Sequence, residues 1–529
     1  METTCRRLVF GAILASASLI GTEAAYASAP IPVEEEKSNF AVTRFGAKGN
    51  GTEKDTAAIQ AAIDACSKAG GGTVFLPAGT FLSGSLHLRS HVALHLDHGA
   101  VLKASKDAGD FDPLEKLDFK NAADRETSFF HHALIWGEDV DHIAITGSGT
   151  IDGNRTKRGG PKQIALKRCQ HVQIKDVTIV DSPNYCISLL GTDYVYIDGV
   201  TILNGFADGI DPDCCHHVRI SNCHIESWDD AICPKTSFSL GSRRSVENLT
   251  VVNCVLATNC NAFKLGTESG GDFKNITVTN CAMYARPVKS APISGISLLS
   301  VDGSNIDGVA ISNISMKGVS WPIFLRLGNR GRDMEKPVPG SLKNVVFSNI
   351  VATDARAACA LLGLPDHPIE GVSIENLRLT FQGGGKKEAT AIDVPEFPAK
   401  YPSADNFGVF PAYGIYCRHV RDLRLAGIRV GAAAPDLRHA VVCDDVTDLV
   451  LDSVESRQFS GGATVFHLRE VRDCMLRGSA PKAGEDSFVR VSGPRSAAIS
   501  LIGNDFSRLK KPLELAPEVA ESKVRIVGN

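Results

Sequence analysis

The stretch Gly205–Thr236, GFADGIDPDCCHHVRISNCHIESWDDAICPKT, contains the acidic residues around which the rest of the chain is organised. Asp208 stands 21 and 22 residues before the adjacent aspartates Asp229 and Asp230. In most folds this separation would carry no information. Here it does, because the surrounding sequence repeats with nearly the same period.

The repeated unit has apolar residues at positions 0, +2, +5 and +7. A spacing of two is the alternation of a strand with one buried face, and the break between +2 and +5 indicates a turn. Position +4 is asparagine in six copies, and Asn and Gly tolerate the left-handed backbone of a sharp bend. The clear copies begin at Val172, Val195, Val218, Leu249, Ile276 and Val309, and looser ones at Val345, Val372, Leu423 and Leu449.

Such units cannot bury their apolar face alone, so they stack into a solenoid around a shared core. The intervals between units range from 23 to 51 residues, which indicates a constant core with loops of varying length. A leucine-rich repeat would show its Leu/Asn consensus and a steadier period. The pattern therefore predicts an all-β fold, a right-handed parallel β-helix.

A helix is expected before the first coils. The segment Asp55–Ala69 is helical by pattern and is ended by Gly70–Gly72. An amphipathic helix at this place would cap the open end of the core. Its apolar face is formed by Ile59, Ala62, Ile63 and Cys66.

The stacking predicts a polar stripe. Asn184, Asp208, Asp229, Asp230 and Asn261 all lie 11 to 13 residues after the start of their unit, and coils stack at about 4.8 Å. A single aspartate there is equally well explained as a turn residue. Three mutually repelling carboxylates favour a function. Adjacent residues of a regular strand face opposite ways, so the aspartate pair must lie at a bend or in a loop.

Composition and the N-terminus indicate an exported protein. The 529 residues carry a net charge of −4, which argues against nucleic-acid binding. Residues 1–27 have a basic start, an apolar run and small residues at Ala25 and Ala27, typical of a secretory signal. Residues 28–40 form a polar leader and 41–529 a single β-helix domain. No later apolar segment is long enough to span a membrane, so a secreted or periplasmic location is expected.

The cysteines are interpreted mainly as core residues. Cys223, Cys254 and Cys281 occupy the +5 position of neighbouring units, which predicts a buried stack of small apolar side chains. Cys214, Cys215 and Cys260 could oxidise, but no pairing follows from the sequence. There is no C-x-x-C pair, so zinc is not expected, and no metal or other cofactor is implied.

Three motifs resemble a known family: FGAKGNGTEKDTAAIQAAIDAC, which begins at Phe45, and then ADGIDPD and WDDAICPKT. Together they resemble the polygalacturonase-type glycoside hydrolases of family 28, which degrade pectin and form right-handed β-helices. The resemblance implies an inverting hydrolase in which Asp229 is the acid while Asp208 and Asp230 hold the water. Clustered carboxylates cannot all ionise freely, so one pKa is expected to be raised.

The chain departs from the family pattern in two places. The family's Gly-His-Gly corresponds to Cys260-Asn261-Ala262, and its Arg-x-Lys pair falls near Ser297–Leu299, without charge. Lys264 could supply a cation to an acidic substrate, or be a solvated lysine. Asn184, Asn261 and Lys264 are the candidate substrate-binding residues. Because the usual pocket is altered, poor activity on plain polygalacturonan and better activity on a mixed pectic backbone are expected.

Aromatic and cationic side chains beyond the acids have two interpretations each. Arg326, Arg330 and Arg332 could bind a carboxylate or solvate a loop. Phe410 and Tyr413, at the end of the insert Gly383–Gly414, could stack on sugars, although burial is favoured.

The sequence therefore predicts a secreted inverting hydrolase of a pectin-type polysaccharide or oligosaccharide that contains galacturonate or rhamnose. No nucleic-acid or membrane partner is expected. Two alternatives stay open. A β-helix polysaccharide lyase would need a Ca²⁺-binding acid cluster and a basic side chain. A non-catalytic carbohydrate-binding solenoid would need no clustered carboxylates.

Overall fold

The computed structural model describes residues 39–286, 292–480 and 487–528, all within one compact unit. The expected signal segment and all but the last two residues of the leader lie outside the described residues. No helix in the described part of the chain is long and apolar enough to cross a membrane.

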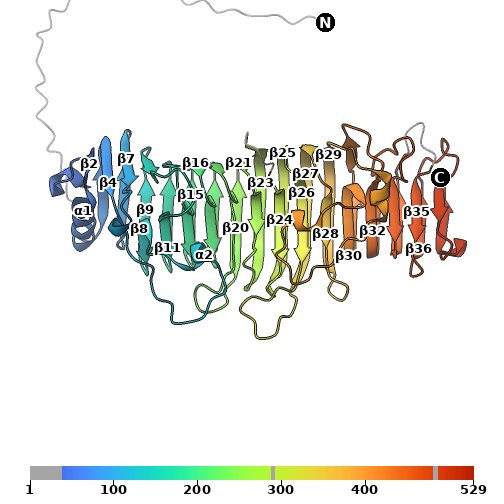
Figure 1. Cartoon of the computed structure of the whole chain (residues 1–529), viewed down its shortest axis with the longest axis horizontal. Coiled ribbons are helices and arrows are strands. Elements are labelled where there is room, and N and C mark those ends of the chain that lie inside the picture. The colour runs from blue at the N-terminus through green and yellow to red at the C-terminus, as the bar shows by residue number, and fades with distance from the viewer. Residues whose placement is uncertain (1–38, 287–291, 481–486, 529) are drawn as a thin grey trace, which may run out of the picture. The chain divides into compact units, whose positions relative to one another are not determined.

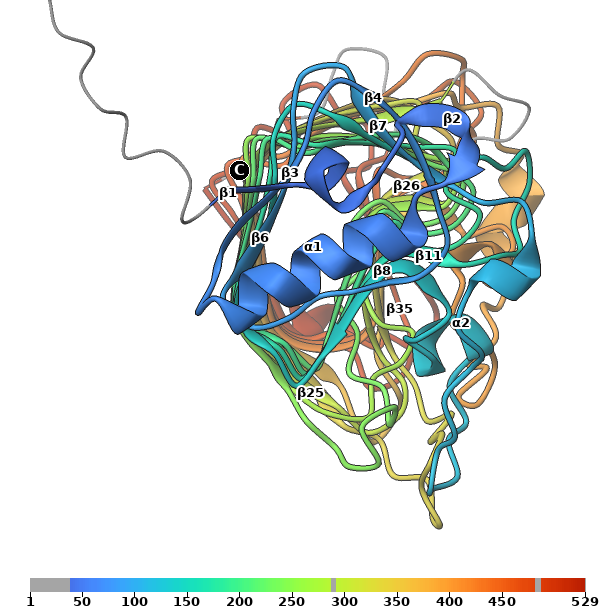
Figure 2. The ribbon, with the colours of Figure 1, turned by 90° about the vertical axis from the view of Figure 1, so that its left-hand side faces the viewer.

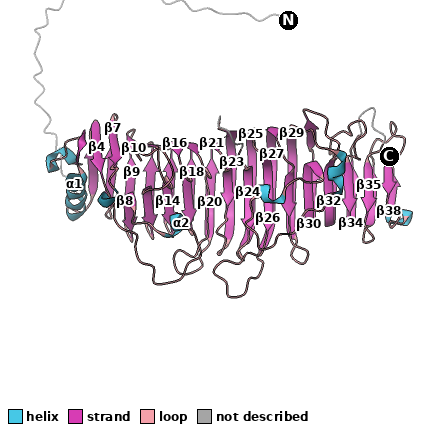
Figure 3. Cartoon of the chain, viewed as in Figure 1, coloured by secondary structure: helices cyan, strands magenta, loops and turns pink. Residues whose placement is uncertain are grey.

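The described residues form a right-handed parallel β-helix whose strands stack in three rows (Figures 1 and 3). The first row consists of β1 (Asn39–Ala41), β3 (Gly72–Leu76), β6 (Val92–Leu96), β9 (Asp141–Thr146), β12 (Gln170–Lys175), β15 (Asp193–Asp198), β18 (His216–Ser221), β20 (Val246–Val252), β23 (Phe273–Ala285), β25 (Asn305–Lys317), β27 (Ser341–Ala355), β29 (Ile369–Phe381), β30 (Ala412–Ala426), β32 (His439–Asp452), β34 (Arg472–Arg477), β36 (Ala497–Ile502) and β38 (Val524–Val527).

The second row continues through the later parts of the long strands β23 to β29. Its other members are β2 (Asn50–Lys54), β4 (Gly79–Ser83), β7 (Ala100–Ala104), β10 (Thr150–Asp152), β13 (Thr178–Val180), β16 (Thr201–Gly205), β19 (His224–Ser227), β21 (Val255–Thr258) and β31 (Arg429–Ala432).

The third row carries the acids and passes through the first parts of β30 and β32. Its other members are β5 (Leu86–His87), β8 (Ala133–Glu138), β11 (Lys162–Lys167), β14 (Ile187–Leu190), β17 (Ile210–Asp213), β22 (Asn261–Leu265), β24 (Ser294–Ser300), β26 (Trp321–Leu327), β28 (Cys359–Leu362), β33 (Phe466–Arg469), β35 (Val489–Ser492) and β37 (Leu513–Leu515).

Strands of the first row pair so that equivalent positions of the sequence repeat lie side by side. Val195, Val218 and Leu249 pair across three consecutive coils, so equivalent positions of each unit stack. The +4 asparagines all have a positive φ, for example 55° at Asn280. Asn280 Oδ1 accepts a hydrogen bond from Asn313 Nδ2 at 3.1 Å. The predicted left-handed turn is confirmed, and its amides form a ladder along the stack.

The core lies inside the coils and is filled by the predicted aliphatic positions. Cys223, Cys254 and Cys281 are buried and free, which confirms the predicted stack. Cys214 and Cys215 are also free and buried, and burial raises the pKa of both thiols. The suggestion that this pair is open to oxidation is therefore wrong.

The predicted N-terminal helix is α1 (Thr56–Lys68), and its buried face consists of the four residues expected. Figure 2 shows α1 lying across the first coils, next to β1, β3 and β6. A second, short helix, α2 (Arg125–Ser128), belongs to the insert between β7 and β8. The 310 helices are η1 (Val42–Phe45), η2 (Ala108–Asp110), η3 (Lys387–Ala391), η4 (Ala404–Phe407) and η5 (Glu521–Lys523).

Among the described residues, three inserts matter for the site. The first is residues 105–132 with α2, and the second is the loop 153–161 between β10 and β11. The third is residues 382–411, which carry η3 and η4. In Figure 1, α2 lies beside the early strands of the third row.

Candidate active site

The aspartate pair lies in a bend, as its adjacency required. Asp229 and Asp230 follow β19 and precede single bridges at Ile232 and Lys235, which continue the third row between β17 and β22. The bend exists because Ser227 Oγ and Thr258 Oγ1 both donate to the carbonyl oxygen of Asp229. The carbonyl oxygen of Asp229 thus bonds to side chains instead of to a neighbouring strand. The regular strand alternation is interrupted here, so the Asp229 and Asp230 side chains can both point outside the core.

The predicted stripe resolves into two adjacent columns. Backbone N–H groups of Cys186, Gly209 and Ala231 donate to the carbonyls of Asp208, Asp230 and Asn261 at 3.0, 2.9 and 2.9 Å. In a parallel ladder, these bonds place Asp208, Asp230 and Asn261 at one position of successive coils.

Asp229 and Asn184 occupy the preceding position of their coils. Asn184 Nδ2 donates to the carbonyl of Gly160 at 3.0 Å, and its Oδ1 accepts from the N–H of Tyr185 at 2.7 Å. Asn184 therefore lies next to the acids and supports the loop 153–161, and its role as a substrate-binding residue stays a prediction.

Two of the three predicted carboxylates, those of Asp208 and Asp229, meet at the backbone N–H of the third residue, Asp230. The N–H of Asp230 lies 3.2 Å from Asp208 Oδ1 and 3.1 Å from Asp229 Oδ1. Asp208 and Asp230 are buried, whereas 28% of the Asp229 side chain is exposed. The cluster thus has two inner carboxylates and one that reaches solvent.

The two inner carboxylates are each paired with a buried lysine. Lys235 Nζ lies 2.7 Å from Asp208 Oδ2 and 2.6 Å from Asp211 Oδ1. Lys264 Nζ lies 2.5 Å from Asp230 Oδ2. These pairs offset the repulsion that three unpaired carboxylates would cause.

The two inner carboxylates differ in electrostatics. Burial, aided by the neighbouring charge of Asp211, raises the pKa of Asp208 well above its ordinary value. Burial acts on Asp230 in the same direction, but Lys264 and a hydrogen bond from Asn261 outweigh it and lower the pKa of Asp230. A carboxyl of the cluster, that of Asp208, thus has a raised pKa, as expected of clustered acids.

Asn261 and Lys264 act on Asp230 directly. Asn261 Nδ2 donates to Asp230 Oδ1 at 2.6 Å, and Ser294 Oγ donates to Asn261 Oδ1 at 2.5 Å. Only 6% of Lys264 is exposed, so the interpretation as a solvated lysine is wrong. Whether either residue also contacts a substrate stays a prediction.

Sequence reasoning missed four residues of the site. Asp211 and Lys235 both lie in the stretch Gly205–Thr236. Strand alternation in β17 would have placed the Asp211 side chain outside the core, but neither residue was predicted to belong to the site. Arg158 lies in a loop without periodicity, and its NH1 is 2.6 Å from Asp229 Oδ2. Tyr401, half exposed, comes from the insert and interacts electrostatically with Lys264.

The two aromatic residues considered for stacking on sugars, Phe410 and Tyr413, are not accessible to a substrate. Phe410 and Tyr413 are buried, which confirms that packing against the coils is their role. No sequence pattern distinguished them from Tyr401, since all three lie in or beside the same insert.

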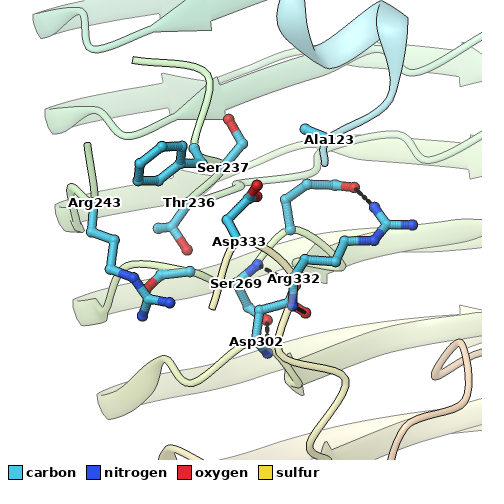
Figure 4. Close-up of a pocket in the computed structure, with 11 residues that line it drawn as sticks. Ala123, Thr236, Ser237, Arg243, Ser269, Asp302, Arg332 and Asp333 are labelled. Carbon is cyan, nitrogen blue, oxygen red and sulfur yellow. Dashed lines mark hydrogen bonds and ion pairs between the residues drawn. The ribbon is translucent and has the colours of Figure 1, made fainter. Parts of the chain in front are cut away.

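The arginines after β26 are paired within the protein. Arg326 is buried and donates to the carbonyl of Gly363 at 3.2 Å. Arg330 and Arg332 pair with Asp302 and Glu268. Figure 4 shows Arg332 and Asp302 side by side in a small pocket, where the N–H of Arg332 donates to Asp302 Oδ1 at 2.9 Å. Internal contacts thus replace both interpretations: Arg326 bonds to backbone carbonyls, and Arg330 and Arg332 form ion pairs.

Two groups of possible metal ligands coincide with the acids: Asp208, Asp211 and Cys233, and Asp229, Asp230 and Cys260. Ca²⁺ takes six to eight oxygen ligands. Here, lysine ammonium groups already occupy one oxygen each of Asp208, Asp211 and Asp230. This donor set does not resemble the calcium site that the lyase alternative requires.

Comparison with known proteins places the fold and site in context. The family model for glycosyl hydrolases family 28 matches residues 66–400. A probable polygalacturonase of Vitis vinifera is 26% identical over 372 residues, covering 65% of this chain and 74% of the relative.

Two solved structures share the fold. The family 28 exopolygalacturonase of Yersinia enterocolitica aligns with a TM-score of 0.58 at 17% identity, covering 83% of this chain and 78% of that one. The hyperthermoactive exopolygalacturonase of Thermotoga maritima aligns with a TM-score of 0.57 at 22% identity, covering 65% and 87%. Since the family model matches more than half of the sequence, and the acids of its two motifs meet in one cluster, the chain belongs to glycoside hydrolase family 28.

Proposed function

We propose that the protein hydrolyses a uronate-containing pectic polysaccharide or oligosaccharide with inversion at the anomeric carbon. The observation that carries the proposal is the meeting of the Asp208 and Asp229 carboxylates at the backbone N–H of Asp230. The names of the relatives support a pectic substrate, since those relatives are described as polygalacturonases.

Asp229 is the general acid. It is the carboxyl of the three with the most exposed side chain, so a glycosidic oxygen can reach it from the cleft. Its proton passes to the leaving oxygen as the bond from that oxygen to the anomeric carbon breaks. A positioned acid of this kind contributes about 10²- to 10⁴-fold to the rate.

Asp208 is the base and Asp230 the fixed negative charge. A base is most effective when its pKa lies near the operating pH, and the raised pKa of Asp208 suits it to take a proton from the attacking water. The pKa of Asp230 is lowered, so its carboxylate stays ionised, orients the water and stabilises the positive charge that develops on the sugar ring. Lys235 holds Asp208 in place.

Inversion requires about 6.5–9.5 Å between acid and base, so that a water fits between them. In the structure, the N–H of Asp230 lies 3.2 Å from Asp208 Oδ1 and 3.1 Å from Asp229 Oδ1, so these two oxygens lie close together. The proposed inversion therefore requires the exposed Asp229 side chain to turn into the cleft when substrate binds. The water then attacks the face of the sugar opposite the leaving group.

The experiment is a panel of pectic polysaccharides incubated with the purified protein, with products identified by mass. Hydrolysis products from a uronate-containing member support the proposal. Unsaturated sugars would establish the lyase instead, and binding without cleavage of any member would establish the non-catalytic solenoid. We also propose export, because the first 27 residues have the pattern of a secretory signal.

A further inference from the structure

A cavity of about 280 Å³ opens beside the acids, between α2 and the loop 153–161. Arg125 and Glu126 contribute to its wall from α2, and Lys162 and Asn184 contribute from the coils. Asn184 bonds to the loop and stands one position from the aspartate column. Through Asn184, the wall of the cavity therefore comes within one position of the aspartate column.

Lys162 is a buried cation with unfilled donors. Only 1% of it is exposed, and its Nζ lies 3.7 Å from the centre of the Phe130 ring. Ser188 Oγ, at 2.9 Å, is the one hydrogen-bond acceptor that it meets among the described residues. An ammonium group has three N–H donors, so two lack an acceptor. Burial lowers the pKa of Lys162 to about 7, as expected for an ammonium without a bonded counter-ion.

Arg158 connects this cavity with the acid. Its NH1 lies 2.6 Å from Asp229 Oδ2, and its Nε lies 3.0 Å from Oε1 of Glu126 in the cavity wall. A guanidinium group carries five N–H donors, of which these contacts and a second bond to Glu126 use three. The Arg158 side chain is 44% exposed, so the remaining donors can reach a ligand.

The other cations at the acids cannot serve a ligand in the same way. Lys235 and Lys264 are both buried and bonded to aspartates, and positions 297–299 carry no charge. Around the cavity, the three cations Arg125, Arg158 and Lys162 stand against two carboxylates, Glu126 and Asp229, both of which contact Arg158. Of the acids that act on Lys162 from further away, Asp211 and Glu115 are paired with Lys235 and Lys167. This leaves an excess of positive charge, which favours an acidic sugar over a neutral one.

We propose that the cavity is a subsite for a uronate residue of the substrate, whose carboxylate is received by Arg158 and Lys162 beside Asp229. A carboxylate accepts two parallel bonds from a guanidinium, and the unfilled donors of Lys162 complete its coordination. The inference rests on the proposed function, since it assigns the substrate class of the same cleft. It makes Arg158 a residue that determines specificity and also positions the acid.

The test compares binding of one oligogalacturonate in its free-acid and methyl-esterified forms. Calorimetry on the Asp229→Asn protein removes turnover from the measurement. In that background Arg158→Gln and Lys162→Met are each expected to weaken binding of the free acid by roughly 10- to 100-fold, the range for a lost hydrogen bond to a charged group. Binding of the methyl ester should change by less than about 3-fold.

Lys157→Gln is the matched control, because Lys157 is exposed on the same loop and the variant makes the same change of charge. It should leave both affinities unchanged. Equal weakening of both ligands in the two site variants, or a Lys157→Gln effect as large as theirs, would overturn the subsite. If Lys162→Met shows no cooperative unfolding, Arg125→Gln replaces it, with the same expectation.

Steady-state kinetics with Arg158→Gln, carried out with Asp229 intact, separates substrate recognition from the positioning of the acid. A higher KM for the free acid alone reports the lost carboxylate contact. A lower kcat on both substrates reports the lost contact with Asp229. If the protein cleaves no substrate but free-acid binding still depends on Arg158 and Lys162, the subsite stands and the proposed hydrolysis falls.

Discussion

Replacing Lys264 by methionine tests the electrostatic design of the acid cluster. In the protein, Lys264 Nζ and Asp230 Oδ2 are 2.5 Å apart and both side chains are buried. Methionine fills a similar volume but removes the charge. Asp230 would then keep the hydrogen bonds from Asn261 and lose its only cation within ion-pair distance among the described residues.

The expected loss of stability is large. Removing one partner of a buried ion pair typically costs about 3–5 kcal/mol, because the other charge is left uncompensated. The hydrogen bonds from Asn261 and the nearby charge of Lys235 reduce that cost, so the lower part of the range, about 3 kcal/mol, is expected at pH 7.

The pH dependence of this loss has a definite sign. Lys264 lowers the folded-state pKa of Asp230 below its ordinary value, so the pair stabilises the fold above the unfolded pKa of about 3.9. That contribution is lost as the pH falls through the folded pKa. The difference between wild type and Lys264→Met should therefore be greatest near neutral pH and shrink below about pH 4.

The assay is urea denaturation at pH 7 and at pH 4, with Lys264→Met/Asp230→Asn as the partner variant. The double variant should recover most of the stability, because neither member of the pair is then charged. The acidic limb of the pH–rate profile of Lys264→Met should also move upwards. Unchanged stability at pH 7, together with a KM effect on acidic substrates alone, would refute this reasoning and favour a substrate-binding lysine.

Three further outcomes follow from the same contacts. Asp229→Asn should lower kcat by about 10²- to 10⁴-fold with an unchanged circular dichroism spectrum; undiminished turnover would remove Asp229 from the mechanism. Burial raises the pKa of Asp213 to about 6, above the unfolded value of about 3.9. Its ionisation thus costs stability as the pH rises from 4 to 6, and Asp213→Asn should be more stable by up to about 2–3 kcal/mol at pH 7 but not below pH 4; a gain at both pH values would contradict this cause. At Asn280, where φ is 55°, alanine should cost about 1–2 kcal/mol in urea denaturation and glycine clearly less; equal losses would assign the effect to the amide ladder instead.

The fold was predictable because the same sequence pattern recurs in many copies. Ten copies of one short pattern each state the same alternation and the same turn, so an error in one copy is corrected by the others. The stacking of Val195, Val218 and Leu249 follows from this redundancy. The bend at Asp229 and Asp230 followed from a single geometric rule, that adjacent strand residues face opposite ways.

The cations of the site were not predictable in the same way. Lys264 could be placed on the coil next to the acids from the repeat register, but the register does not say which carboxylate a long side chain meets. Arg158 and Tyr401 lie in loops outside the coils, where no period fixes their position. Which aspartate has the raised pKa also depends on burial and on Lys235, which only the assembled coils define.

The anomeric form of the first product tests the central claim most directly. Proton NMR of a pectic oligosaccharide during the first turnovers should show the new reducing end with the configuration opposite to that of the cleaved linkage, and no unsaturated sugar. Retention of configuration would contradict the proposed roles of Asp208 and Asp229, and an unsaturated product would contradict hydrolysis itself.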